Sequence, residues 1–141
     1  MFSLPYSDKA LIIRTDFSKE SKWKEVCAAI NDPSNAFQVF AEFIDEPKFK
    51  DADIKNFPKF SITDSIHGFA LVVDAQTSLH PEFPILCVDL DEEFGRTFRV
   101  IPKEVWSVSA NLALSNMDFY EFADNVDNDG IFRGFKPLDI N

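Results

Sequence analysis

Residues 10–30, ALIIRTDFSKESKWKEVCAAI, decide the fold class of this chain. They begin with an apolar, β-branched run over 10–15, which is typical of a buried strand. Asp16-Phe17-Ser18 then offers side chains that cap helix N-termini, and Asn31-Asp32-Pro33 marks the end of a helix. Between these signals, one face of an amphipathic helix is formed at the spacing i, i+3, i+4 and i+7 by Trp23, Val26, Cys27 and Ile30. A buried strand that leads directly into a helix predicts a β-α-β start and an α/β fold class.

The middle of the chain predicts further strands. Alternating or continuous apolar runs favour strands at 36–45, 68–74, 85–90 and 96–101. The acidic turn that ends in Gly95 joins the last two of these as an antiparallel hairpin over 85–101. A short helix is expected at 51–57, followed by a loop that runs to His67.

Two helices are expected near the C-terminus. Pro102 suits the first position of one helix, and Ser115-x-x-Asp118 resembles a capping box ahead of the other. The apolar face of that second helix is formed by Phe119, Phe122, Ala123 and Val126. The tail from Gly130 has the composition of a loop. We therefore expect a single domain over 1–141, with an ordered core at 10–135 and an α/β or α+β mixed sheet of about five strands.

The chain is strongly acidic, with a net charge of −10 from 14 Lys and Arg against 24 Asp and Glu. Such a field repels phosphate backbones and anionic lipids, so neither nucleic acid nor a membrane surface is an expected partner. It favours a basic protein partner, a cation, or simply solubility. No apolar run approaches the length of a membrane span, and the residues after Met1 lack a signal-peptide pattern. Cys27 and Cys87 have no disulfide or metal-ligand spacing and are expected to be buried free thiols, so the cytoplasm is the expected location.

Four predicted strands end in, or lead into, an acid: Asp16, Asp45, Asp74 and Asp89. Carboxylates that gather at one end of a parallel sheet could bind a divalent cation. The antiparallel pairing expected between 68–74 and 85–90 places Asp74 and Asp89 at opposite ends of the sheet, and capping explains acids at strand ends equally well. No metal and no cofactor are therefore predicted.

Residues 125–130, NVDNDG, superficially match the first half of a calcium-binding loop. The position that needs a bidentate Glu is Lys136, and Pro137 prevents the usual exit helix. A polar segment that ends in Gly130 explains the same residues, so no calcium site is predicted here.

No catalytic set stands out in the sequence. His67 and His80 lie in expected loops, and although Ser65 and Ser78 are near in sequence, no nucleophile-elbow spacing supports a triad. With four glycines in the chain, there is no glycine-rich phosphate loop.

Arg14 has two readings. Arg14 ends a buried strand two residues before Asp16, so the simpler interpretation is that it forms an ion pair inside the protein. The other is that Arg14 lines a pocket with residues of the C-terminal half. The candidate ligand-binding residues are then Arg14, Asp16, Asp74, Arg96, Trp106, Asn111 and Asn116.

Four segments carry a resemblance to a known family: 11–18 (LIIRTDFS), 95–100 (GRTFRV), 116–123 (NMDFYEFA) and 129–135 (DGIFRGF). Through them the chain resembles a mainly bacterial family of small stand-alone proteins classed as a domain of unknown function. The resemblance spans roughly residues 10 to 135 and therefore the whole expected domain. It implies no activity, ligand or catalytic residue.

Two hypotheses of function follow. The first is a non-enzymatic acidic binding protein, of the inhibitor or immunity type, that acts on a basic partner. It rests on the net charge, on acidic surface stretches at 45–64 and 118–129, and on apolar side chains in expected loops, namely Phe94, Phe132 and Phe135. The alternative is a small-molecule sensor or an enzyme with a pocket around Arg14, Asp16, Asp74, Arg96, Trp106 and Asn116.

Overall fold

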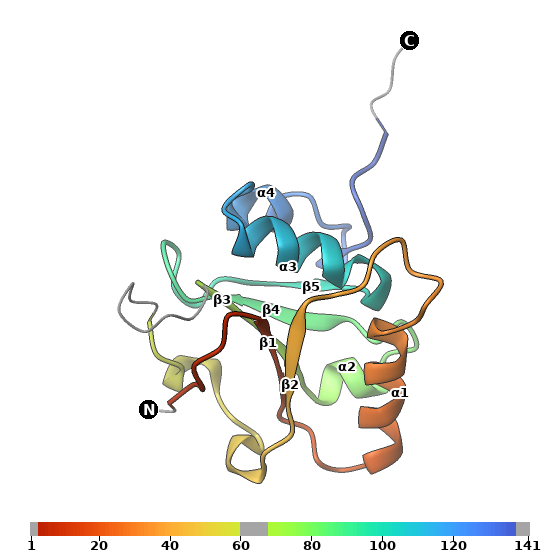
Figure 1. The fold of residues 1–141 in the computed structure, drawn as a ribbon, viewed down its shortest axis with the longest axis vertical. Coiled ribbons are helices and arrows are strands. Elements are labelled where there is room, and N and C mark those ends of the chain that lie inside the picture. The colour runs from red at the N-terminus through yellow and green to blue at the C-terminus, as the bar shows by residue number, and fades with distance from the viewer. Residues whose placement is uncertain (1–2, 60–67, 138–141) are drawn as a thin grey trace.

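A six-stranded mixed sheet in the order β2-β1-β3-β4-β5-β6 forms the centre of the molecule (Figure 1). The computed structural model describes residues 3–59 and 68–137. The expected loop up to His67 falls partly in 60–67, outside the described residues. The strands are β1 (Ala10–Arg14), β2 (Ala41–Ile44), β3 (Phe69–Val73), β4 (Ile85–Asp89), β5 (Thr97–Val100) and β6 (Ile131–Phe132).

The helices are α1 (Glu20–Ile30), α2 (Ala75–Leu79), α3 (Val105–Ala113) and α4 (Phe119–Ala123). Short 3-10 helices occupy Pro47–Phe49, Ile54–Asn56 and Pro102–Glu104. No helix in the described part of the chain combines the length and apolar character needed to cross a bilayer.

Five of the strands run in one direction and β4 runs against them. β1 pairs in parallel with β2 and β3, β4 pairs antiparallel with both β3 and β5, and β6 is parallel to β5. The α/β class, the β-α-β start and the hairpin over 85–101 are thus confirmed. The sheet consequently has a carboxyl end, where β1, β2 and β3 finish, and an amino end, where they begin.

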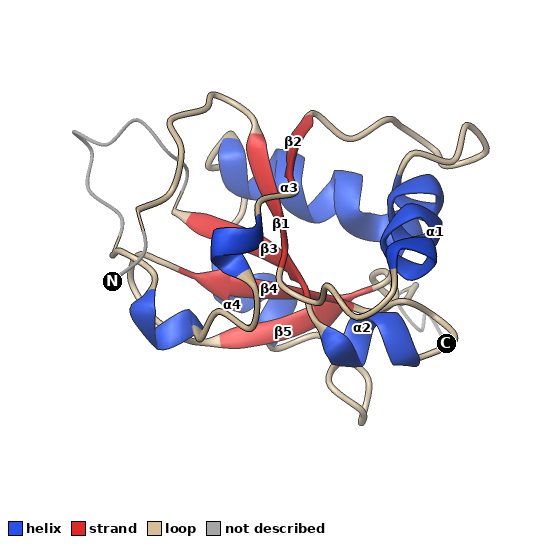
Figure 2. Ribbon diagram, turned by 90° about the horizontal axis from the view of Figure 1, so that it is seen from below, coloured by secondary structure: helices blue, strands red, loops and turns tan. Residues whose placement is uncertain are grey.

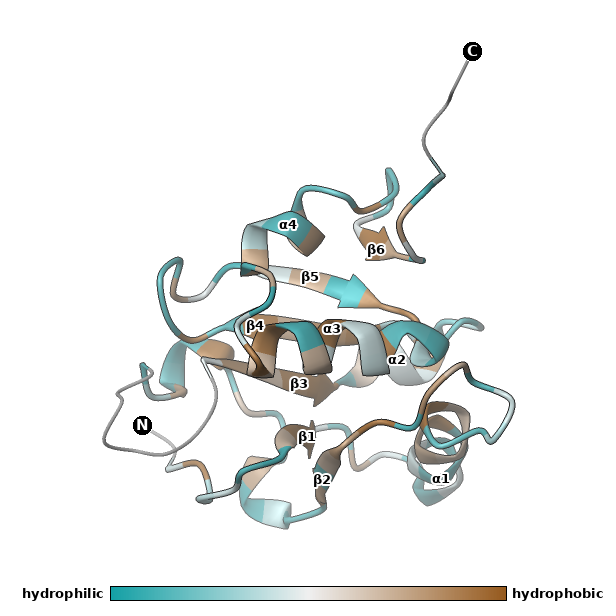
Figure 3. Ribbon diagram, turned by 45° about the horizontal axis from the view of Figure 1, so that its top comes forward, coloured by the Kyte–Doolittle hydropathy of each residue, from teal (hydrophilic) through white to brown (hydrophobic). Residues whose placement is uncertain are grey.

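The two faces of the sheet are covered differently. One face carries α1, α3 and α4, and the main core lies beneath them around Trp23, Val26, Val108 and Phe122 (Figures 2 and 3). The opposite face is covered by chain with little regular structure. Its core is built on Phe49 and Phe57, both fully buried against alternate residues of β1 and β3. Each Phe buries a large apolar area without a polar atom to satisfy, which lets a loop-like segment cover a sheet.

β6 corrects the expectation of a loop-like tail and raises the strand number to six. Ile131 and Phe132 pair with Arg99 and Val100 of β5. Phe132 is fully buried, with its ring centroid 5.3 Å from that of Phe122. It is therefore core, although the sequence predicted an exposed loop position. A two-residue strand is too short to produce the period-2 pattern by which strands are recognised.

Several element boundaries also differ from prediction. The expected strand 36–45 is regular only over β2, and the expected helix at 51–57 is a 3-10 turn. α2 was missed in the connection after β3; five residues are too few for a helical pattern, but its capping box, Asp74 with Thr77, was visible in the sequence. The capping box of α4 is formed by Asp118 and Glu121, whereas the sequence suggested Ser115 and Asp118.

Candidate functional site

The carboxyl end of the sheet is the usual ligand position in α/β folds, and here the topology creates a switch point between β1 and β3. The chain leaves β1 through α1 to reach β2 on one side, and returns across the other face to β3. The backbone N–H groups of Thr15 and Asp16 donate to the Val73 carbonyl over 3.0 and 3.3 Å. The switch point is thus closed by the protein's own hydrogen bonds.

Asp16 completes that closure. Its carboxylate accepts a hydrogen bond from the Ser18 N–H at 3.1 Å. Partial burial alone would raise the pKa of Asp16, but hydrogen bonds from Ser18 and Ser78 hold it below its ordinary value. The side chain therefore links the start of the β1–α1 connection to α2.

Arg14 is enclosed at the same end of the sheet, with 3% of its side chain exposed. Its guanidinium donates to Glu20 over 2.8 Å and to Asp45 over 3.1 Å, and its Nε donates to the carbonyl of Asp16. The Phe17 ring lies 4.3 Å from the guanidinium carbon. Burial alone would lower the pKa of Arg14, but these hydrogen bonds keep it raised. The internal ion pair is the arrangement observed, with Glu20 and Asp45 as the acids.

Asp74 is the third candidate at the carboxyl end. It binds the Arg99 guanidinium through both oxygens, at 2.9 and 2.7 Å, and it caps α2 by accepting from the Thr77 N–H. Burial alone would raise the pKa of Asp74, but Arg99 and Thr77 hold it below its ordinary value. Arg99, which is not among the candidate ligand-binding residues, is thus the partner of one that is.

The remaining candidates lie elsewhere. Trp106, on α3, packs its ring 4.6 Å from that of Phe37. Asn111 donates to the Ser107 carbonyl within the same helix, and its own carbonyl accepts from the N–H of Asn116. Arg96 precedes β5 at the amino end of the sheet. The structure therefore groups Arg14 and Asp16, with Asp74 at the same end, and does not bring Arg96, Trp106 or Asn116 to them.

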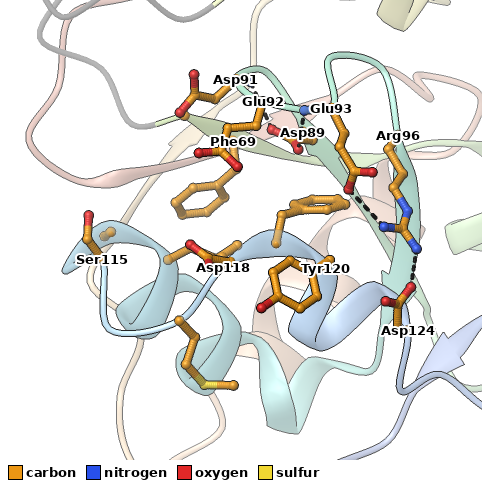
Figure 4. A pocket seen from close by; sticks show the side chains of 15 residues that line it. Phe69, Asp89, Asp91, Glu92, Glu93, Arg96, Ser115, Asp118, Tyr120 and Asp124 are labelled. Carbon is orange, nitrogen blue, oxygen red and sulfur yellow. Dashed lines mark hydrogen bonds and ion pairs between the residues drawn. The ribbon is translucent and has the colours of Figure 1, made fainter.

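The hollow at the amino end of the sheet has a volume of about 720 Å³, and Arg96 is the one predicted candidate that lines it (Figure 4). Its apolar lining comes from the start of β3 and from the α3–α4 region and includes Phe69, Leu112, Met117 and Phe119. Its polar lining contains six carboxylates and a single guanidinium. We call it the acidic hollow; its charged residues are Asp89, Asp91, Glu92, Glu93, Asp118, Asp124 and Arg96.

Asp89 builds one wall of the acidic hollow. It is 3% exposed, and its carboxylate accepts the backbone N–H groups of Asp91 at 2.8 Å and Glu93 at 3.1 Å. These bonds set the shape of the β4–β5 turn, and Gly95, at φ 92°, completes it. The turn passes close to Gly68: if residue 68 carried a side chain, its Cβ would lie 3.1 Å from the Cβ of Asp91.

The facing wall is the turn between α3 and α4. Ser115 adopts a left-handed conformation, φ 56°, and the Asn111 carbonyl accepts the N–H groups of Asn116 and Met117. This turn brings Asp118 to the rim at the start of α4. The Arg96 guanidinium joins the two walls, because it pairs with Glu93 of the hairpin and with Asp124 after α4.

Some carboxylates of the acidic hollow make no ion pair with any residue that the structure describes. Glu93 and Asp124 share Arg96, and Asp89 is satisfied by backbone N–H groups. Within residues 3–59 and 68–137, Asp91, Glu92 and Asp118 make no ion pair. Exposed apolar side chains stand beside them: Phe94 in the hairpin turn is 41% exposed and Tyr120 on α4 is 49% exposed. Two features of the sequence pointed to this site: the acidic turn 91–93, which is followed by Phe94, and the acidic residue Asp118 at the start of α4.

Metal binding finds no support in the part of the chain that the structure describes, where no three His, Cys, Asp or Glu side chains are arranged to hold an ion. In the calcium-like segment, Asp127 and Asp129 bind the Arg133 guanidinium over 2.8 and 2.7 Å. Arg133 also binds Glu82, which ties the end of β6 to the α2–β4 connection. The Arg133 guanidinium thus takes the position between Asp127 and Asp129 that a bound metal ion would need.

The cysteines differ from each other in burial. Both are free; Cys87 is buried as expected, whereas Cys27 is only partly buried because it lies at the margin of α1's apolar face. Burial raises the pKa of the Cys27 thiol to about 11 and raises that of Cys87 well above its ordinary value. Thiols with raised pKa values are poor nucleophiles at neutral pH.

Comparison with known families assigns the chain to one of them. A family model described as a domain of unknown function, DUF6924, matches residues 9–135. The chain belongs to the DUF6924 family. The family match spans all six strands and both walls of the acidic hollow, so the hollow lies within the DUF6924 domain. A search of curated proteins found no match.

Proposed function

We propose that this DUF6924 protein is a non-enzymatic binding protein whose acidic hollow receives a basic segment of a partner protein. The observation that carries the proposal is the arrangement of Asp91, Glu92 and Asp118. They come from two separate walls, face one apolar-lined hollow and make no ion pair in the described chain. An apolar floor beneath carboxylates that make no ion pair suits an arginine or lysine side chain, which has an apolar stem and a charged head.

The exposed aromatic side chains add to this argument. Tyr120 lines the acidic hollow on the α4 side, and Phe94 belongs to the hairpin turn that forms the other wall. Protein interfaces concentrate their affinity in aromatic anchors next to charged pairs, and complementary charge accelerates the encounter of two proteins. A role of the inhibitor or immunity type follows if the basic segment belongs to the working surface of an enzyme or toxin.

The reducing cytoplasm of a bacterial cell is the location that we propose for this interaction. Cys27 and Cys87 support it, because both thiols are free and disulfides predominate in oxidising compartments. The resemblance to a mainly bacterial family supports the cellular origin.

A peptide titration with a matched pair of variants tests the proposal. The probe is a fluorescently labelled hexa-arginine peptide, and its anisotropy is measured with increasing protein. The variants are Glu92→Lys in the acidic hollow and Glu25→Lys on α1; both residues are exposed and both changes alter the net charge equally. We expect Glu92→Lys to weaken binding about tenfold or more and Glu25→Lys to change it less than about twofold, as for a localised charge contact.

Salt provides the second readout. Binding should weaken steeply between about 50 and 200 mM NaCl, where the Debye length falls below about 10 Å. Equal weakening by both variants would show that only the net charge attracts the peptide, and this result would overturn the assignment to the hollow. Absence of binding at low salt would overturn the proposal as a whole.

A further inference from the structure

β2 is the outermost strand of the sheet on one side, and no strand among residues 3–59 and 68–137 pairs with its outer edge. Its neighbour is β1, and the Ala10 N–H donates to the Phe40 carbonyl at 3.2 Å. In a parallel ladder, successive residues direct their backbone groups alternately to the two sides of a strand. The N–H and C=O groups of Ala41 and Phe43 therefore point away from β1, and no strand in the described chain pairs with them.

The edge of β2 is short and carries Glu42, but it lacks other common protections against strand addition. Residues 37–44 read FQVFAEFI, without the proline or inward-pointing lysine that usually blunts an edge. Phe37 and Phe40 are 64% and 63% exposed. Phe37 stands against Trp106 on the helical face, and Phe40 belongs to the opposite face of the strand. Apolar surface thus flanks the unpaired backbone groups on both sides.

One positive and one negative side chain, Lys9 and Glu42, lie beside the edge of β2, so the edges of two copies have complementary charges. Lys9 holds its ammonium 5.5 Å from the centre of the Phe40 ring. Glu42 follows two residues later, and one of its carboxylate oxygens is buried without a hydrogen-bond partner. Neither Lys9 nor Glu42 makes an ion pair within residues 3–59 and 68–137.

We propose that β2 is a dimerisation edge on which a second copy of this chain adds its own β2 antiparallel. With Ala41 opposite its counterpart across a two-fold axis, Phe40 and Lys9 of each copy face Glu42 of the other. The dimer then gains two lysine–glutamate contacts in all, and the outward backbone groups of the two β2 strands pair. A register with Ala41 opposite Phe43 would set the two Glu42 side chains against each other, and like charges directly opposite destabilise a strand pair.

The dimer is small and the copies repel each other at long range. A short strand and two exposed Phe rings per copy form an interface at the low end of specific sizes, for which dissociation constants of about 10 µM to 1 mM are expected. Each copy carries a net charge of −10. Salt screens this repulsion, so the dimer strengthens as ionic strength rises. Binding of a basic partner in the acidic hollow has the opposite dependence on salt, which separates the two proposals.

Sedimentation velocity over a range of protein concentrations tests the dimer. We expect the dimer fraction to rise with concentration and to be larger in about 500 mM than in about 50 mM NaCl. Lys9→Glu and Glu42→Lys should each raise the dissociation constant about tenfold, and an equimolar mixture of the two variants should restore association because opposite charges then meet at both contacts. Leu79→Lys, at a side chain that is 82% exposed and lies on α2, is the matched control without effect.

Hydrogen exchange locates the contact independently of any variant. The amides of Ala41 and Phe43 should exchange rapidly in dilute protein and slow at least about fivefold at the highest concentration. A protein that stays monomeric over the whole range overturns the proposal. So does a dimer that survives both charge reversals, or one that leaves these two amides unprotected.

Discussion

Asp74 has two separable tasks, and substituting it tests the account of the carboxyl end given above. It pairs with Arg99 through both carboxylate oxygens and caps α2 through Thr77. Asp74→Asn keeps a side chain that caps helices about as well as Asp and removes the charge. Asp74→Ala removes both.

The structure sets the size of each effect. The pair is largely shielded, with side-chain exposures of 13% for Arg99 and 28% for Asp74. Hydrogen bonds to charged groups contribute about 1.5–3 kcal/mol, so Asp74→Asn should lower the free energy of unfolding by about 2 kcal/mol. Loss of the cap adds about 1 kcal/mol in Asp74→Ala. For a domain of this size, these losses correspond to Tm decreases of about 7 °C and 10 °C.

Urea unfolding of the three proteins as a function of pH is the assay. The folded pKa of Asp74 lies below its ordinary value, so the stabilisation is complete above the unfolded pKa of about 3.9 and is lost as pH falls through the folded pKa. The difference between the wild-type protein and Asp74→Asn should therefore be constant from neutral pH down to about pH 5 and shrink below about pH 4.

Two results would refute this reasoning. If Asp74→Asn is as stable as the wild-type protein at neutral pH, the Arg99 pair contributes nothing. If the difference between the two proteins persists unchanged at low pH, it does not arise from the ionised carboxylate. Equal stability of Asp74→Asn and Asp74→Ala would show that the cap does not stabilise the protein, without contradicting the contribution of the ion pair.

Three further outcomes can be checked. Phe122→Ala should lower the free energy of unfolding by about 3–5 kcal/mol because a fully buried ring leaves a cavity, and Phe135→Ala, with a half-exposed ring, by about 1 kcal/mol; thermal unfolding measures both. Alkylation of Cys27 by iodoacetamide, followed by mass spectrometry, should accelerate about tenfold per pH unit up to its pKa of about 11, while Cys87 stays unmodified in the folded protein. Gly68→Ala should broaden or shift the NMR signals of the β4–β5 turn, because the new Cβ meets Asp91; unchanged signals would contradict the close approach.

The sequence predicted the fold well where local pattern and packing coincide. β1, α1, β3, β4 and β5 each bury a regular set of apolar residues, so their periodicity is visible in the sequence. It failed at β6 and α2, which are too short for a period. The packing of Phe49 and Phe57 against the second face of the sheet was also not predicted, because the chain that places them has no repeating geometry.

The candidate site was predicted less well, for a topological reason. Arg14, Asp16 and Asp74 were recognised as unusual, and they are: all three hold the carboxyl end together. Polar residues near buried strands signal internal pairing as readily as ligand binding. The acidic hollow is assembled from a hairpin turn and an inter-helix turn about 25 residues apart, and only the antiparallel course of β4 brings these turns to the same end of the sheet.

The central position of β1 has a consequence for biosynthesis. β1 lies between β2 and β3, so its second neighbour comes from residues 69–73. At ribosomal rates of about 5–20 residues per second, several seconds separate the synthesis of β1 from that of β3. During that interval Leu11, Ile12 and Ile13, which end up almost entirely buried, have no completed sheet to enter. Until β3 is made, these side chains can be covered only by packing against α1 and by pairing with β2, whereas the β4–β5 hairpin, whose contacts are local, forms without such a delay.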